Sequence, residues 1–257
     1  MELKIAIIGA GNLATRVSIS LKEKNIDIVQ VFSRTEKSAS ELALKLGCNY
    51  TVDPATITED ADVYLVSVSD SALSELLPKI NFNNKLVVHT AGSVPMDILK
   101  EVSSNYGVFY PLQTFSKQRA IDFEEIPFCI EANSFENEKT LIGLASTLSD
   151  DVRIISSEQR KQIHLAAVFA SNFVNHMFAV ASKVLAQKGV PLDILYPLID
   201  ETVSKAKAID PILAQTGPAL RNDQNTMSEH LKMLSDDPEL KDLYSILSKS
   251  ILNFSNL

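Results

Sequence analysis

The sequence has few cysteines, no excess of positive charge and no metal-binding pattern. Its 257 residues include two cysteines, Cys48 and Cys129, which are too few and too far apart for a disulfide framework. We therefore expect a reducing, cytoplasmic environment, with both cysteines as small core residues. The net charge of −8 argues against nucleic acid or an anionic membrane as a partner. No Cys/His spacing resembles a metal site, so no metal is expected.

The N-terminus lacks the pattern of a signal peptide, because its apolar stretch is short and leads directly into a glycine turn. Residues 163–182 carry no formal charge and have to be weighed as a membrane span. Their histidine, asparagine and serine side chains are too polar for a comfortable span. We therefore expect a helix buried inside a helical domain, and no membrane as a partner.

A glycine-rich turn follows the first apolar run of the chain. Residues 5–8 read as a buried strand, residues 9–14 have the pattern G-x-G-x-x-A, and residues 15–24 read as a helix. Glycine permits the tight bend and lets the backbone approach a pyrophosphate, which the N-terminus of the helix then faces. This context favours nucleotide binding, although an ordinary turn between strand and helix has the same local pattern.

The end of the second predicted strand bears on which dinucleotide binds. An NAD site usually has an acidic residue there, on the ribose 2′-hydroxyl. This sequence instead has Ser33, Arg34 and Thr35, and Asp27 comes before the strand rather than after it. Because arginine offers a planar fork to a 2′-phosphate, we predict NADP rather than NAD. The alternative is a solvated loop with a helix cap.

Strands and helices alternate through residues 1–155. This pattern predicts a mostly parallel sheet with right-handed crossovers, which is the doubly wound Rossmann plan. Predicted strands cover 5–8, 28–32, 63–66, 86–88, 107–109, 128–130 and 152–155, and predicted helices cover 15–24, 38–46, 71–77, 96–102 and 136–148.

From residue 156 onward the pattern is helical. A long helix is predicted over 158–188, where Gly189 stops it, and a second over 192–208. Thr226 and Glu229 have the spacing of a capping box for a later helix, and Asp236-Asp237-Pro238 opens the last. The fold class is therefore α/β, with an N-terminal doubly wound Rossmann domain (1–155) followed by an all-α C-terminal domain (156–257).

Polar residues follow several predicted strands, at the edge where open parallel sheets bind ligands. Each has an alternative role, because a serine can cap the next helix and a glycine can permit a turn. His89 ends one strand and is a candidate for the catalytic site. The predicted cofactor site comprises Gly9, Gly11, Asn12, Leu13, Ser33, Arg34, Thr35, Ser67, Val68, Ser69, Ala91 and Gly92.

The helix predicted from residue 158 carries a polar stripe. At 100° per residue, Ser171 and Asn175 lie near the direction of His164, and Asn172 lies further round. Burying such groups unpaired costs about 1–3 kcal/mol each, so we expect them to line a pocket. The alternative is a structural core histidine. Arg221 follows a Gly-Pro break and can bind a carboxylate or phosphate, or form a surface salt bridge.

The sequence resembles Rossmann-like proteins with a C-terminal DUF2520 domain, described as candidate NADP oxidoreductases and related to 6-phosphogluconate dehydrogenase and pyrroline-5-carboxylate reductase. The resemblance covers nearly the whole chain. One departure is Tyr110, where such proteins often have histidine. A second is that Lys161 is followed four residues later by Leu165, so the Lys–Asn pair of the hydroxyacid dehydrogenase branch is absent. The resemblance is carried by the turn 9–14, 89–93, 111–115, His164, Ser171-Asn172 and 217–223.

These observations predict an NADP-dependent oxidoreductase acting on a small carbonyl or imine substrate. The cofactor supplies hydride, and the protein positions the substrate and provides a proton. His164, Asn172, Arg221 and His89 are the predicted catalytic residues, in an interdomain cleft near Gly92, with His164 as proton donor. Because related enzymes dimerise through such helices, we expect a homodimer involving residues 158–188. The alternative is a protein that binds NADP as a sensor or binds a partner, without turnover.

Overall fold

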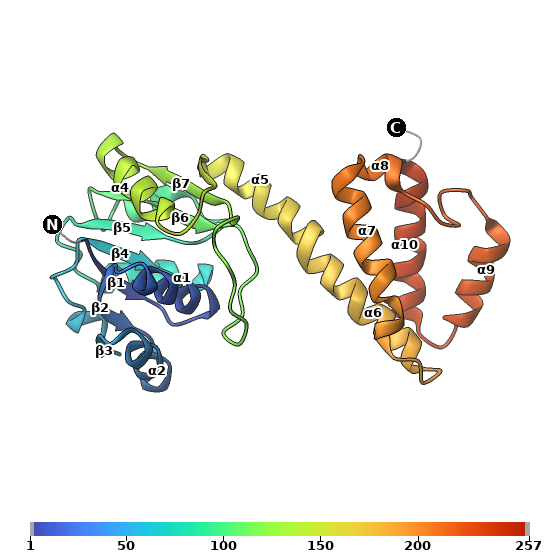
Figure 1. Cartoon of the computed structure of the whole chain (residues 1–257), viewed down its shortest axis with the longest axis horizontal. Coiled ribbons are helices and arrows are strands. Elements are labelled where there is room, and N and C mark those ends of the chain that lie inside the picture. Colours follow the sequence, from blue (N-terminus) through green and yellow to red (C-terminus); the bar gives the residue numbers. More distant parts are fainter. Residues whose placement is uncertain (1–2, 255–257) are drawn as a thin grey trace. The chain divides into compact units, whose positions relative to one another are not determined.

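The computed structural model describes residues 3–254. Clustering of contacts divides the chain into two units, with the division between Ser171 and Asn172. The first unit holds one eight-stranded sheet with helices on both faces, and the second is helical (Figure 1). This is the α/β fold class predicted from the sequence, with a Rossmann-type sheet followed by helices.

The strand order is β3-β2-β1-β4-β5-β6-β7-β8. Strands β1 to β6 are parallel to their neighbours, whereas β7 is antiparallel to β6 and parallel to β8. The strands are β1 (Lys4–Ile8), β2 (Asp27–Phe32), β3 (Asn49–Thr51), β4 (Val63–Val66), β5 (Leu86–His89), β6 (Tyr106–Pro111), β7 (Phe128–Ala132) and β8 (Val152–Ile154).

Successive side chains of the strands point to opposite faces, so the sheet has two hydrophobic cores. In β1, Ile5 and Ile7 belong to the core under α1, α2 and α4, whereas Ala6 and Ile8 belong to the core that also contains Leu73 of α3. The helices and short turns of the first unit are α1 (Asn12–Glu23), α2 (Glu36–Leu46), η1 (Pro54–Thr56), α3 (Asp70–Leu76), η2 (Leu77–Lys79), η3 (Met96–Leu99) and α4 (Phe135–Ser146).

One long helix leads from the first unit into the second. It consists of α5 (Ser157–Ala167), a π-helical segment η4 (Val168–Phe173) and α6 (Val174–Ala186). A π turn has i→i+5 hydrogen bonds and so advances by less than 100° per residue. The predicted alignment of Ser171 and Asn175 with His164 therefore does not hold, because the π segment lies between them.

The same helix, Ser157–Ala186, is long and apolar enough to cross a membrane, with a mean hydropathy of 1.3 in its most apolar window. None of that window is buried, so the prediction of a helix buried inside a helical domain is wrong for the single chain, whose helices do not cover it. Length and composition alone do not distinguish a membrane span from a helix that protein covers, and α5 packs on the first unit through its buried Arg160.

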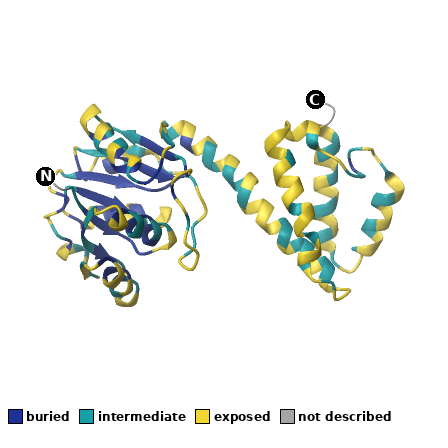
Figure 2. Cartoon of the chain, in the orientation of Figure 1, coloured by how far each residue is buried: buried dark blue, intermediate teal, exposed yellow. Residues whose placement is uncertain are grey.

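The second unit has almost no buried residue. Ala219 is the only buried residue among the described residues 172–254, and Figure 2 shows these helices in teal and yellow where the strands of the sheet are dark blue. Its remaining elements are η5 (Leu192–Leu195), α7 (Tyr196–Ala208), α8 (Pro211–Ala214), α9 (Gln224–Met233) and α10 (Pro238–Phe254).

The predicted capping box of α9 is wrong. The helix begins three residues earlier, and its cap is Asp223, whose carboxylate accepts hydrogen bonds from the Thr226 amide at 3.1 Å and hydroxyl at 2.8 Å. Thr226 therefore lies inside the first turn rather than before it. The predicted stop at Gly189 is confirmed, since this residue has a φ of +66°.

Candidate functional site

The carboxyl ends of β1, β2, β4, β5 and β6 meet at one edge of the sheet, because these strands are parallel. The strand order reverses between β1 and β4. Ligands of doubly wound sheets bind at such a switch point, beyond the carboxyl ends of the strands. The loops that follow these strands therefore form the candidate site.

Gly9 makes the turn after β1 at the switch point. Its φ is +119°, and its amide donates to the Phe32 carbonyl at 2.8 Å. A β-carbon at this position would lie 2.2 Å from the Ser67 carbonyl oxygen, which follows β4. Only glycine fits here, and its absence of a side chain lets the ends of β1 and β4 lie together.

Gly11 has a different surrounding. It is the N-cap of α1, and a β-carbon there would meet nothing within 4 Å. The space beside Gly11, at the start of the turn that contains Asn12 and Leu13, is therefore open. Such a helix N-terminus binds phosphate through amides and dipole, so this turn fits the pyrophosphate of a dinucleotide.

Neighbouring residues in the loop after β2 have different roles, one in capping a helix and one as a candidate for binding the cofactor. Thr35 caps α2, since its hydroxyl oxygen accepts the Ser38 amide at 3.4 Å. Thr35 thus has the helix-cap role that was the alternative to cofactor binding. Arg34 is exposed and Ser33 is half-buried. Arg34 is therefore free to contact a 2′-phosphate.

Hydrogen bonds connect the loops that follow β4 and β5. The Thr90 hydroxyl donates to the Ser67 hydroxyl at 3.1 Å, and the Ser93 hydroxyl donates to the carboxylate of Asp70, the first residue of α3. Ser69 precedes that helix as its N-cap. These contacts hold both loops at the edge where the glycine turn lies.

His89 lies beneath the loop after β5. Its side chain is fully buried, and its Nδ1 accepts the Ala91 amide at 3.1 Å. Burial, and then the nearby charge of Arg160, lower the pKa of His89 from 6.5 to about 4. The imidazole is therefore neutral near pH 7. This placement favours a role in shaping the loop, and the predicted catalytic role stays a prediction.

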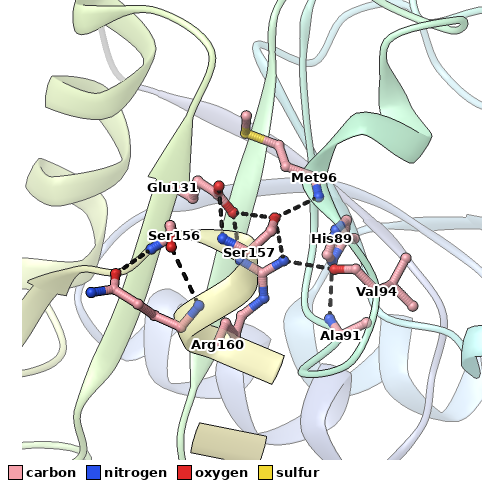
Figure 3. Close-up of polar contacts among 9 residues, drawn as sticks. His89, Ala91, Val94, Met96, Glu131, Ser156, Ser157 and Arg160 are labelled. Atoms are coloured by element: carbon pink, nitrogen blue, oxygen red, sulfur yellow. Dashed lines mark hydrogen bonds and ion pairs between the residues drawn. The ribbon is translucent and has the colours of Figure 1, made fainter. Parts of the chain in front are cut away.

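Arg160 of α5 connects the same loop to the antiparallel strand β7. Its guanidinium is completely buried, contacts the Glu131 carboxylate at 2.6 Å and donates to the Val94 carbonyl at 2.6 Å. Ser157 donates to Glu131 at 2.6 Å and accepts the Met96 amide at 2.9 Å (Figure 3). The network fixes the first turns of α5 on the loop 89–96.

Glu131 is the anion of this network. Burial alone would raise the pKa of its carboxyl group, but the hydrogen bonds from Ser157 and Arg160 outweigh that effect and lower it. The carboxylate is thus charged at neutral pH and balances Arg160. Removing either partner would leave a largely buried charge unpaired, at a cost of about 3–5 kcal/mol.

His164 lies one turn further along α5 and reaches Gly92. A β-carbon at Gly92 would lie 2.5 Å from the His164 Nδ1 and 3.0 Å from the Tyr110 Cζ. The Tyr110 hydroxyl and the His164 Nδ1 are 3.3 Å apart. His164 is half-buried and Tyr110 is buried. The structure therefore brings one predicted catalytic residue and one predicted cofactor residue into contact at the ligand-binding edge.

Comparisons with known proteins agree with this geometry. The family described as NADP oxidoreductase coenzyme F420-dependent matches residues 4–92, and the domain of unknown function DUF2520 matches residues 126–251. A candidate NADP oxidoreductase of known structure from Bacteroides fragilis is 51% identical, with 98% of each chain covered and a TM-score of 0.94.

The chain belongs to this family of NADP oxidoreductases with a DUF2520 domain.

Two further proteins with lower identity also match this chain. An imine reductase from Myxococcus stipitatus in complex with NADP+ has the same fold, with 15% identity, a TM-score of 0.63, and 97% of this chain and 92% of that one covered. A pyrroline-5-carboxylate reductase from Staphylococcus aureus is 28% identical over 107 residues, which are 38% of this chain and 39% of that protein. The chain spans less than half the length of the curated relatives it matches.

The remaining predicted site residues of the oxidoreductase belong to the second unit or to its boundary. Asn172 lies in the π segment, and Arg221 is exposed in the loop before α9, where its amide donates to the Gly217 carbonyl at 3.5 Å. Their predicted roles toward a substrate stay predictions. The motif residue Asp223 has a structural function, because it caps α9.

Three residues of this site have no specific role predicted from the sequence. Tyr110 is one of the polar residues that come after a predicted strand, with packing as the alternative, and Arg160 and Glu131 have no predicted role. In the structure Tyr110 lies within β6, near its end, and its place beside the predicted strand was the available signal. No local pattern indicates the Arg160–Glu131 pair, because the two residues are distant in sequence and meet only when α5 packs on β7.

Proposed function

We propose that this protein is an NADPH-dependent reductase of a small carbonyl or imine substrate, with His164 as the proton donor. The observation that carries the proposal is the contact of the His164 imidazole with Gly92, at the edge where the Gly9 turn fits a dinucleotide. A hydride acceptor bound there would lie between the nicotinamide and the His164 imidazole, a group that can act as a general acid.

The chain supplies the groups that would hold the cofactor. The amides at the start of α1 would bind the pyrophosphate, and Gly11 leaves the space for it. Arg34 would pair with the 2′-phosphate, which is the reason for preferring NADP over NAD. When bound, NADPH supplies the hydride.

The protein then has to present the substrate and provide a proton. His164 is half-buried, so its imidazole is accessible while α5 holds it in place. Arg160 anchors that helix one turn before His164, and Ser157 anchors it two turns before. Asn172 and Arg221 are proposed to assist, Asn172 by orienting the substrate and Arg221 by binding a carboxylate.

We also propose a cytoplasmic location. Cys48 and Cys129 are both free thiols in the structure. Burial raises the pKa of Cys48 to about 11 and also raises that of Cys129, which suits inert core residues rather than nucleophiles.

The proposal is tested with NADPH carrying deuterium at the transferable position. The enzyme is incubated with a panel of small carbonyl compounds and cyclic imines, and the products are examined by mass spectrometry. We expect deuterium on carbon in the reduced product of one compound class. Tight NADPH binding without label transfer to any member would favour the alternative, a protein that binds NADP without turnover, which the missing Lys–Asn pair at Lys161 and Leu165 also suggests.

A further inference from the structure

Tyr110 is the partner of His164 that the proposed function does not use. It lies near the end of β6, where it pairs with Cys129 of β7, and its side chain is 8% exposed. Its ring meets the His164 ring edge-on, with centroids 6.3 Å apart and an interplanar angle of 71°. The sheet fixes the phenol, so the hydroxyl stays beside the His164 Nδ1 at 3.3 Å.

The chemistry of the two groups decides which one donates. A phenol loses its proton near pH 10, whereas the unprotonated nitrogen of imidazole takes one up near pH 6.5, each about its ordinary value. Phenol is therefore the better donor and imidazole nitrogen the better acceptor. Burial raises the pKa of Tyr110, so the hydroxyl keeps its proton through the neutral range.

We propose that Tyr110 is a positioning residue for His164, whose hydroxyl donates to Nδ1 and so holds the neutral imidazole in the tautomer protonated at Nε2. Gly92 is the third member of this arrangement, because any side chain there would displace the imidazole from the phenol. In that tautomer the Nε2–H is the hydrogen-bond donor that His164 can direct at a substrate oxygen or nitrogen, and it becomes the transferable proton once Nδ1 has taken up a second one.

The phenol suits this task because it can also accept. When His164 takes up a second proton, its Nδ1–H needs an acceptor, and the Tyr110 hydroxyl can rotate and offer a lone pair. A phenylalanine at this position could neither donate to the neutral imidazole nor accept from the protonated one. This inference rests on the proposed function only where it names a substrate as the target of the Nε2–H. The tautomer itself is a property of the protein without substrate.

The test is nitrogen NMR of the full chain labelled with ¹⁵N in its four histidines. His164→Gln assigns the His164 signals by their loss. In the neutral imidazole we expect Nδ1 to have the shift of an unprotonated nitrogen that accepts a hydrogen bond, and Nε2 that of a protonated one. A wild-type spectrum with the proton on Nδ1 would overturn the proposal, and this measurement needs no substrate and leaves Tyr110 in place.

Tyr110→Phe provides the second arm. We expect the Nδ1 signal to move to the position of a nitrogen without a hydrogen bond, and the tautomers to approach the mixture of a free imidazole. Tyr106→Phe, on the same strand, is the matched control and should leave both signals unchanged. Unchanged His164 signals in a folded Tyr110→Phe protein would also overturn the proposal. If the tautomer is as expected but no substrate accepts hydride, only the proposed function fails.

Discussion

Gly92 and His164 lie so close together that the site requires residue 92 to have no side chain. A β-carbon on residue 92 would lie 2.5 Å from Nδ1 and 2.8 Å from Cγ of the imidazole. Arg160 of α5 binds both the loop 89–96 and β7. Neither the backbone of this loop nor that of α5 can therefore move away easily. The imidazole would have to rotate away.

Gly92→Ala should therefore displace His164 and reduce turnover, with a loss of about 1–3 kcal/mol in unfolding free energy from the forced contact. Thermal unfolding and NADPH-dependent turnover measure the two effects. Gly143→Ala is the control, because a β-carbon at position 143 of α4 meets nothing within 4 Å, and it should be neutral or slightly stabilising. A Gly92→Ala protein as stable and active as the wild type would contradict the observed contact.

Arg34 should distinguish the two nicotinamide dinucleotides. It is exposed just after the end of β2, where the sequence has Ser33 in place of the usual acidic residue. Arg34→Ala should weaken NADPH by about 1.5–3 kcal/mol, the contribution of a charged hydrogen bond, and barely change NADH. Fluorescence titration with both nucleotides measures this, with Lys45→Ala in the last turn of α2 as a charge-matched control. Equal wild-type affinities for NADPH and NADH would contradict it.

The buried His89 should make stability depend on pH. Its pKa is lowered from 6.5 to about 4, so the unfolded chain binds a proton in this range that the folded protein does not. The stabilisation is complete above about pH 6.5 and is lost as the pH falls toward 4, by about 3 kcal/mol in total. Urea unfolding at several pH values measures the slope.

His89→Gln should flatten that slope, whereas His176→Gln, which removes an exposed histidine, should keep it. The same slope in His89→Gln and wild type would show that another group is responsible. Carboxylates such as Asp62, whose pKa is lowered chiefly by the Lys4 amide hydrogen bond, contribute mainly below about pH 5, so the slope measured above about pH 5 is the one that reports on His89.

The second unit should be covered by another copy of the chain. A helical unit whose only buried residue, among those described, is Ala219 has no core of its own. Leu198 and Ile246 are 62% and 66% exposed. We expect a homodimer, with twice the 28.2 kDa mass of one chain in light scattering. Glutamate at both positions should dissociate it, whereas Leu44→Glu on α2 should not. A wild-type monomer at micromolar concentration would contradict this expectation.

Much of the sheet could be predicted because its strands are buried on both faces. Such strands appear in the sequence as short apolar runs, and Val63–Val66 is predicted to the residue. Asn49–Thr51 was missed because this edge strand has three residues, two of them exposed. The antiparallel direction of β7 could not be predicted either, since the connection before it has no regular pattern.

The sequence predicts a site residue only where the local backbone conformation allows a single residue type. Gly9 is such a case, because its turn has a known sequence pattern. Among the neighbours of His164, Gly92 is predicted to lie near it, whereas Tyr110 is not, because Tyr110 reaches it from β6. The polar stripe on the long helix could not be aligned from the sequence because nothing in it signals the π segment Val168–Phe173.

The central claim is that His164 donates a proton during reduction, and one comparison tests it most directly. Once a substrate is identified, turnover and NADPH affinity are measured for wild type and His164→Gln. Loss of the general acid should lower turnover by about 10²–10⁴-fold while NADPH affinity stays unchanged. If His164→Gln retains turnover and instead only lowers the melting temperature, His164 is a structural residue and the account of the site is wrong.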